Sequence, residues 1–263
     1  MKKEMTQDAF LRKRAERQRK IRRRRLKIFF TLFVVFLMGL SVVLCLTVFF
    51  PIENINIKGS EIYTEAKIIK ASGIEIGDNL FATAKGTVLK KLKAKLPYIE
   101  DIEFERELPG SLTVKVKDAG EYACYFDGKS YYTVSNNGWV LKKEFEAAQN
   151  VFTVYGAKVK CKVGTALEFS DENTKELTEK IIMALSSEEL LINRIDITDT
   201  VTITVNVEDR FEVNLGTANY ITEKVKHLAS MIDNIAPEKS GKINLSMWTN
   251  ANTQGTFVEQ INE

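Results

Sequence analysis

The feature of this sequence that most constrains its fold is an uncharged apolar tract directly behind a run of arginines: "IRRRRLKIFFTLFVVFLMGLSVVLCLTVFFP", residues 21–51. The 23 residues from Ile28 to Phe50 contain no charged side chain. A helix of that length, rising ~1.5 Å per residue, extends roughly 35 Å and can cross the ~30 Å hydrocarbon core of a bilayer. Pro51 would end such a helix. The tract therefore predicts one transmembrane helix, residues 28–50, as a membrane anchor.

The charge on either side of this tract predicts the orientation of the chain. Residues 1–27 hold thirteen Lys and Arg and three acids, a net charge of +10, whereas the remaining residues carry −7. Lys and Arg beside a spanning helix stay in the cytoplasm. We therefore expect residues 1–27 to form a basic cytoplasmic tail and residues 51–263 to lie outside the cell membrane. The residues expected to set this topology are Arg22, Arg23, Arg24, Arg25 and Lys27.

Other uses of the N-terminal region fit less well. The apolar region of a cleaved signal peptide spans ~7–15 residues and precedes a small-residue cleavage site, and this tract is longer and has no such site. A lipid-attachment cysteine would follow small residues, but Val42, Val43 and Leu44 precede Cys45. Basic runs also bind nucleic acid, yet next to a spanning helix their usual role is orientation, with contact to anionic lipid. An uncleaved anchor is therefore favoured, and no nucleic acid is expected as a partner.

The first exported segment, residues 51–118, has the pattern of a small α+β domain. Alternating apolar residues predict strands in "IENINIKG", "IEDIEFEREL" and "LTVKVK". Between the first two, "TEAKIIKAS" begins at a Thr cap and stops at Gly73, and "AKGTVLKKLKAKLP" carries an apolar stripe and ends at Pro97. The predicted order is strand-helix-helix-strand-strand.

The second exported segment, residues 119–248, is predicted to be a mixed α/β domain with a mainly antiparallel sheet. Asp-Gly and Asn-Gly turn signals divide "YACYFDGKSYYTVSNNGWVLKKE" into a three-stranded meander. "VFTVYG" predicts a further strand, residues 194–216 a hairpin, and "GKINLSMW" a last strand. Helices are predicted over 171–191 and 221–235. Residues 249–263 form a polar, turn-like tail that is expected to be mobile.

No arrangement of residues reaches the strength of an active site. The single histidine, His227, lies beside the apolar stripe of a predicted helix, and no nucleophile motif accompanies it. The sequence lacks the clustered His and Cys of zinc sites. Asp196 and Asp199 could hold a cation or act as acid and base on a glycan, but strand-end carboxylates are usually solvated. We therefore expect no catalytic residue, metal, cofactor or small-molecule substrate. A disulfide between Cys124 and Cys161 is permitted outside the membrane but not implied.

The last predicted strand, "GKINLSMW", is the candidate binding surface. If Ile243, Leu245 and Met247 face the core, Trp248 points toward solvent or a partner. A terminal strand is often an edge strand, whose unpaired N–H and C=O groups can accept the strand of another chain. The alternative is that this strand closes the sheet and Trp248 packs over it. The candidate partner-binding residues are Gly241, Lys242, Ile243, Asn244, Leu245, Ser246, Met247 and Trp248.

Several motifs follow the anchor in a fixed order: "I-x-N-I-x-I-x-G", "I-x-x-x-G-I-x-x-G-x-N-L-F", "L-P-Y-I-E-D-I-x-F-x-R-E-L-P-G-S-L-T-V-x-V", "V-S-N-N-G-W-V-L", "F-E-V-N-L-G" and "G-K-I-N-L". Their order and spacing behind a single anchor resemble the FtsQ/DivIB family of bacterial cell-division proteins. The resemblance covers nearly everything from Ile52 to Met247. It implies a POTRA domain over residues 51–118 and the family's β domain over residues 119–248.

The resemblance also implies a function. It implies a non-enzymatic scaffold of the divisome at the division septum, which links FtsB/DivIC-like and FtsL-like single-span proteins to septal peptidoglycan synthesis. In the family the partner adds a strand along the C-terminal strands of the β domain, which here implies residues 241–248. Confinement of all partners to one membrane raises their effective concentration, so that modest pairwise contacts can assemble a complex.

Two other functions compete with the scaffold. A membrane-anchored POTRA protein that assists secretion or folding of exported polypeptides would bind many extended clients weakly, whereas a scaffold binds one or two helical partners stoichiometrically. An extracellular glycan-acting enzyme would use Asp196 or Asp199. The sequence favours the scaffold because its distinctive features are surfaces and an anchor.

Overall fold

The computed structural model describes residues 25–41, 43, 49–249 and 251–260. Residues 25–41 are helical and expose their apolar side chains. Within these described ranges, no helix combines the length and the apolar character that crossing a membrane requires. The predicted span also includes residues 42 and 44–48, and the predicted topology-setting residues include Arg22 to Arg24, all of which lie outside the described residues. Phe49 and Phe50, the last two residues of the predicted span, are not helical. The rest of the transmembrane helix stays a prediction.

Close contacts divide the chain into two compact units. One takes in Ile74–Ala84 and Glu105–Thr113 together with the described part of the chain up to Asn56. The other takes in Ile57–Gly73, Lys85–Phe104 and Val114–Glu263.

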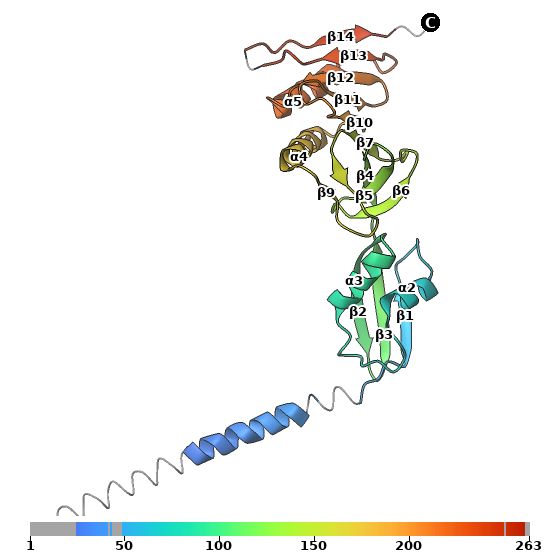
Figure 1. The fold of residues 1–263 in the computed structure, drawn as a ribbon, viewed down its shortest axis with the longest axis vertical. Helices are drawn as coiled ribbons and strands as arrows, with labels where there is room; N and C mark the ends of the chain where they lie inside the picture. The colour runs from blue at the N-terminus through green and yellow to red at the C-terminus, as the bar shows by residue number, and fades with distance from the viewer. Residues whose placement is uncertain (1–24, 42, 44–48, 250, 261–263) are drawn as a thin grey trace, which may run out of the picture. The chain divides into compact units, whose positions relative to one another are not determined.

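Residues 51–118 have the predicted order of strand, helix, helix, strand and strand (Figure 1). Their three-stranded sheet has the order β1-β3-β2. The elements are β1 Asn54–Lys58, α2 Glu65–Ser72, α3 Lys85–Lys95, β2 Ile99–Glu107 and β3 Ser111–Asp118. Gly73 ends α2 in the left-handed conformation (φ 67°), as predicted, but the Thr64 side chain makes no capping hydrogen bond. Buried apolar residues of this segment include Ile52, Ile68, Leu80, Leu92, Ile99, Ile102, Leu112 and Val114.

The chain after residue 118 contains a nine-stranded sheet in the order β14-β13-β12-β11-β10-β7-β4-β5-β6. Three neighbouring pairs are parallel, namely β4 with β7, β7 with β10, and β12 with β13, and the others are antiparallel, so the prediction of a mainly antiparallel sheet is confirmed. The strands are β4 Glu121–Phe126, β5 Tyr131–Ser135, β6 Val140–Glu144, β7 Phe152–Tyr155, β10 Ile192–Asp196, β11 Ile203–Val207, β12 Phe211–Gly216, β13 Gly241–Asn244 and β14 Thr256–Glu259. A small hairpin of β8 Val159–Lys160 and β9 Glu168–Phe169 was not predicted.

Helices α4, Glu172–Ser187, and α5, Ile221–Asp233, pack against each other and against one face of this sheet (Figure 1). Asp171 caps α4 by accepting hydrogen bonds from the backbone of Asn173 and Thr174. Both helices are amphipathic, and their apolar sides join alternate strand residues in one core. Its fully buried members include Val154, Ile181, Leu185, Ile195, Val205, Phe211, Val213, Leu215, Val225, Leu228 and Ile243. This packing places the C-terminal strands at one end of the sheet.

Candidate partner-binding edge of the nine-stranded sheet

Strand β13 lies where the last strand was predicted, but it is not an edge strand. It pairs in parallel with β12 on one side and antiparallel with β14 on the other. The expectation that residues 241–248 expose an unpaired backbone is therefore wrong for Gly241–Asn244. The strand that covers them is β14, which forms where the sequence predicted a polar, turn-like tail. In the described part of the chain, no strand pairs with the outer side of β14.

The second half of the predicted strand is a turn, and its side chains face opposite to expectation. Met247 is 78% exposed and Trp248 only 7% exposed. The alternation ends after Leu245, because the Asn244 side chain accepts a hydrogen bond from the backbone of Ser246 and the Trp248 backbone N–H donates to the carbonyl of Leu245. The prediction that Trp248 faces solvent or a partner is therefore wrong. Of the alternative, the packed position of Trp248 holds, but β14 rather than the predicted strand closes the sheet.

The buried indole of Trp248 packs beside α5. Its ring centroid lies 6.2 Å from that of Tyr220 and 6.4 Å from that of His227. This position makes the single histidine of the chain part of an aromatic contact. The surroundings of His227 match the predicted position on the flank of a helix and not those of a catalytic base.

The side chains along β13 and β14 allow the two strands to pair closely. A Cβ atom added at Gly241 would lie 2.2 Å from the carbonyl oxygen of Val258, so only glycine allows this approach. Phe257 turns toward the core, with its ring centroid 6.1 Å from that of Phe211. Val258 points the other way and is 65% exposed. The fourth β14 residue, Glu259, pairs with Lys239 at 2.9 Å.

The backbone of β14 offers outward hydrogen-bonding groups at alternate residues. The N–H of Gln260 donates to the carbonyl of Ser240 at 2.9 Å, just beyond the end of the β13–β14 ladder. Hydrogen-bonded pairs alternate along an antiparallel ladder, so the backbone groups of Val258 face β13 and those of Phe257 and Glu259 face away from it. An incoming strand would find its partners at Phe257 and Glu259.

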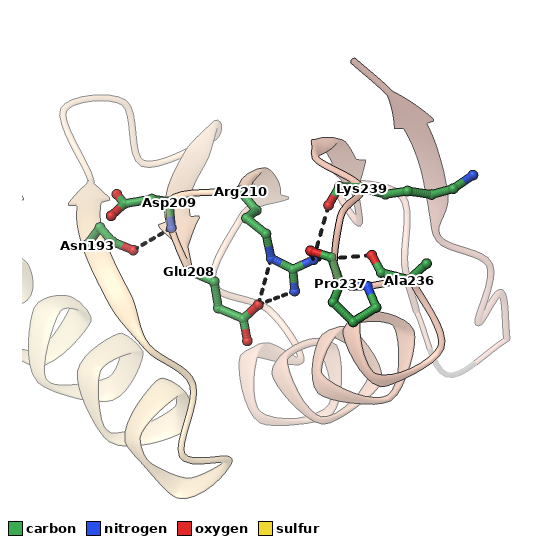
Figure 2. A network of polar contacts seen from close by, with 7 residues as sticks. All are labelled: Asn193, Glu208, Asp209, Arg210, Ala236, Pro237 and Lys239. Carbon is green, nitrogen blue, oxygen red and sulfur yellow. Dashed lines mark hydrogen bonds and ion pairs between the residues drawn. The ribbon is translucent and has the colours of Figure 1, made fainter. Parts of the chain in front are cut away.

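A polar cluster at the start of β12 holds the segment that leads into β13 (Figure 2). Arg210 donates to the backbone carbonyls of Ala236, Pro237 and Lys239, at 3.3, 2.8 and 3.1 Å. Its guanidinium also pairs with Glu208. These five residues are called the Arg210 cluster below. The Arg210 guanidinium satisfies the carbonyls that follow the C-terminus of α5. These hydrogen bonds fix where β13 begins.

The turn between β11 and β12, which contains Arg210, has the backbone angles of a tight β-hairpin turn. Glu208 and Asp209 both have positive φ, 55° and 54°. Two successive residues of this kind match the right-handed twist of the flanking strands. The side chain of Asn193 on β10 accepts a hydrogen bond from the backbone of Asp209 at 2.9 Å (Figure 2). The turn is thus held from β10 as well as from the α5 side.

A buried lysine holds the other end of α5. Lys224 is 1% exposed, and its ammonium donates to the carbonyls of Leu215 and Thr217 at 2.5 and 2.9 Å. Burial lowers the pKa of Lys224. The lysine connects α5 to the end of β12, so both ends of the helix are tied to the strand next to β13.

The carboxylates considered for glycan chemistry have structural roles. Asp196 pairs with Arg194 at 2.7 Å and accepts from the backbone of Thr198 at 3.0 Å. Burial opposes ionisation of Asp196, but the hydrogen bonds from Thr198 and Arg194 outweigh it and lower its pKa. A general acid needs the opposite shift. Asp199 accepts a hydrogen bond from the backbone of Val201 in a turn.

A groove of about 1160 Å³ lies between α4 and the strands β4 and β5, and its lining contains neither histidine nor cysteine. Three carboxylates, of Glu168, Glu172 and Glu179, line it, and Lys175 pairs with Glu172 at 2.8 Å. Among the described residues, no cluster of His, Cys, Asp and Glu could hold a metal ion.

Cys124 and Cys161 both carry free thiols. Burial raises the pKa of the Cys124 thiol and raises that of Cys161 to about 12. Neither thiol has the lowered pKa of a nucleophilic cysteine.

Comparison with known proteins agrees with this architecture. A family model described as "POTRA domain, FtsQ-type" matches residues 50–118, the segment with the strand-helix-helix-strand-strand order. Residues 50–118 thus match an FtsQ-type POTRA domain. The chain is 26% identical to "Cell division protein DivIB" of Clostridium botulinum over 86% of this chain and 90% of that relative.

Two further relatives extend the comparison. The chain is 24% identical to "Cell division protein DivIB" of Geobacillus kaustophilus over 88% of this chain and 85% of the relative. It is 26% identical to "Cell division protein FtsQ" of Streptomyces coelicolor over 39% of each. These comparisons confirm the resemblance to the FtsQ/DivIB family of cell-division proteins that the motifs indicated.

Proposed function

We propose that this cell-division protein is a non-enzymatic, membrane-anchored scaffold of the divisome that binds a partner strand at the outer edge of β14. The partners are FtsB/DivIC-like and FtsL-like single-span proteins, and through them the septal peptidoglycan synthesis machinery. The observation that carries the proposal is the open backbone of β14, with Val258 exposed beside it. The site moves outward by one strand from the predicted residues 241–248, which support β14 instead.

The anchor and its orientation belong to the same proposal. The uncharged tract of residues 28–50 supports a spanning helix, and the basic residues before it support a cytoplasmic N-terminus. Both exported domains then lie outside the membrane at the septum. The lowered pKa of Asp196 and the packed position of His227 support a role without catalysis.

The test is a pair of substitutions at one residue of β14. Glu259→Pro removes an outward N–H while keeping the bonds of Val258 to β13, because proline lacks the donor. Glu259→Ala removes the same ion pair with Lys239 but keeps the N–H. We expect the proline variant to lose at least about tenfold in affinity for the FtsB/DivIC-like ectodomain, since several strand-addition bonds depend on it.

The alanine variant is the matched control and should bind within about twofold of the wild type, because exposed ion pairs contribute little. Affinity is measured by surface plasmon resonance with the full chain, and circular dichroism checks the fold. Equal binding by the two variants would remove strand addition at β14 from the proposal. A fluorescent fusion that fails to form a midcell ring in growing cells would remove the divisome role itself.

A further inference from the structure

Four large apolar side chains lie exposed on segments that meet at one end of the three-stranded sheet. Phe49, Ile76, Phe81 and Leu108 are 70%, 74%, 44% and 65% exposed, and together they are called the apolar tip. Phe49 precedes β1, Ile76 and Phe81 lie between α2 and α3, and Leu108 lies between β2 and β3. All four belong to the same compact unit.

The segment between α2 and α3 is tied to the residues where the apolar tract ends. The N–H of Leu80 donates to the carbonyl of Phe50 at 2.9 Å, and the N–H of Ile52 donates to the carbonyl of Asp78 at 2.7 Å. The rings of Phe50 and Phe81 meet edge to face, with centroids 5.4 Å apart. Ile52 and Leu80 are fully buried, so this connection is a fixed part of the core.

The turn between β2 and β3 is tied to the same residues. The N–H of Glu53 donates to the carbonyl of Gly110 at 2.7 Å. A Cβ atom on Gly110 would lie 2.5 Å from the carbonyl oxygen of Pro51, so the two backbones pass in close contact. Leu108 stands two residues from this contact and remains exposed.

We propose that the apolar tip inserts into the headgroup region of the outer membrane leaflet, so that lipid covers Ile76, Phe81 and Leu108. The inference rests on the proposed anchor, which ends at Phe50. The headgroup region extends roughly 5–7 Å beyond the hydrocarbon core on each side. The Phe81 ring contacts the Phe50 ring directly. Leu108 lies two residues from Gly110, whose backbone passes close to the carbonyl oxygen of Pro51. These side chains therefore lie within reach of the headgroup region.

The charges around the apolar tip indicate which lipid property attracts it. Glu75, Asp78 and Glu107 flank the exposed side chains in the sequence. These carboxylates repel anionic lipid, so apolar burial rather than headgroup charge drives the insertion. The tip therefore inserts more readily into zwitterionic phosphatidylcholine than into anionic membranes. A second contact beside the anchor also restricts how the first exported domain tilts on the membrane.

The experiment uses the full chain reconstituted in phosphatidylcholine vesicles. The fluorescent residue dansylalanine replaces Ile76 or Leu108, and lipids brominated on their acyl chains serve as quenchers. Leu191, which is 71% exposed on the segment between α4 and β10, is the matched control. Brominated lipid should remove about half or more of the emission at positions 76 and 108, because side chains of interfacial segments lie ~5–10 Å deep. The probe at position 191 should keep its emission.

Flotation of the vesicles separates failure of the apolar tip from failure of the anchor. If the chain floats with the vesicles but the emission at both 76 and 108 is unquenched, insertion of the apolar tip is ruled out and the anchor stands. Chain that does not float overturns both together. A triple variant, Ile76→Asp, Phe81→Asp and Leu108→Asp, should still float, but trypsin should cleave its first exported domain faster on vesicles. Unchanged cleavage would also count against insertion.

Discussion

The two ends of the nine-stranded sheet carry edge strands of opposite character. At one end, β14 leaves its outer side without a pairing strand in the described residues and exposes Val258 beside it. At the other end, β6 begins under a covering segment. The N–H of Val140 donates to the carbonyl of Thr165 at 2.9 Å, the N–H of Gly164 donates to the carbonyl of Val140 at 3.0 Å, and Trp139 forms a bridge with Ala166.

The uncovered half of β6 is charged. Lys142, Lys143 and Glu144 follow one another there, and Lys142 pairs with both Glu121 and Glu144 at 3.0 and 3.1 Å. Covering segments and charged side chains are the usual means by which proteins prevent unwanted strand pairing. One sheet thus protects one edge and leaves the other available, which is what a protein with a single strand-addition site requires.

The largest expected effect comes from the Arg210 cluster, which positions the open edge. Arg210→Met removes charge-assisted hydrogen bonds to three carbonyls and leaves Glu208 without its guanidinium partner. We expect the free energy of unfolding to fall by about 3 kcal/mol. Urea unfolding measures the fall, and hydrogen exchange should show β13 and β14 losing protection while β6 keeps it.

Arg194→Met is the control for this prediction. Arg194 also pairs with an acid, Asp196, but its side chain is more than half exposed, so the loss should stay below about 1 kcal/mol. Equal losses for the two arginine variants would show that the Arg210 cluster does not specifically support the open edge.

A smaller effect is expected where β14 meets β13. Gly241→Ala places a Cβ atom against the carbonyl oxygen of Val258 and the ring of Phe257. Such overpacking should lower the free energy of unfolding by about 2 kcal/mol and increase hydrogen exchange across residues 256–259. Gly120→Ala is the control, because its Cβ would meet no atom within 4 Å. If residues 256–259 keep their protection in Gly241→Ala, β14 does not depend on this close approach.

Periodicity predicted most of the fold but not the end of the sheet. The strand-helix-helix-strand-strand order and the two amphipathic helices follow from alternation and from apolar stripes, which are local signals. The strand β14 has four residues and contains only two apolar ones, Phe257 and Val258. Its existence depends on Gly241 and Phe211, which are distant in sequence, so no local pattern could predict it.

The candidate site moved for the same reason. Alternation through "GKINLSMW" assumed that the strand continues to Trp248, but the Asn244 side chain binds the backbone of Ser246 and ends it. Asparagine in a strand is a weak warning of such a turn. The supporting role of Arg210 could not be predicted, because the carbonyls that it binds lie in a loop 26 to 29 residues further along the chain.

The smallest expected effect is a pH response of the protected edge. Burial opposes ionisation of Glu121, but hydrogen bonds, one of them from Lys142, outweigh it and lower its pKa in the folded state. A lowered folded-state pKa stabilises the fold above the ordinary pKa of the carboxyl, and this stabilisation is lost as the pH falls through the folded-state pKa. Acidification from pH 6 to pH 3 should therefore loosen β6.

Lys142→Met tests this response, because it removes the cation from the protected edge. The part of the acid destabilisation that comes from this edge is about 0.5 kcal/mol, since the ion pairs are partly exposed. Urea unfolding at each pH should show a shallower acid response in the variant than in the wild type, and hydrogen exchange should place the difference in β6 rather than in β14. β14 should not differ between the two proteins, because Lys142 pairs only at the opposite end of the sheet and the ion pair of Glu259 with Lys239 is unchanged by the substitution. An identical acid response in the two proteins would mean that the charges on β6 do not stabilise that edge, and its covering segment alone would then account for the protection.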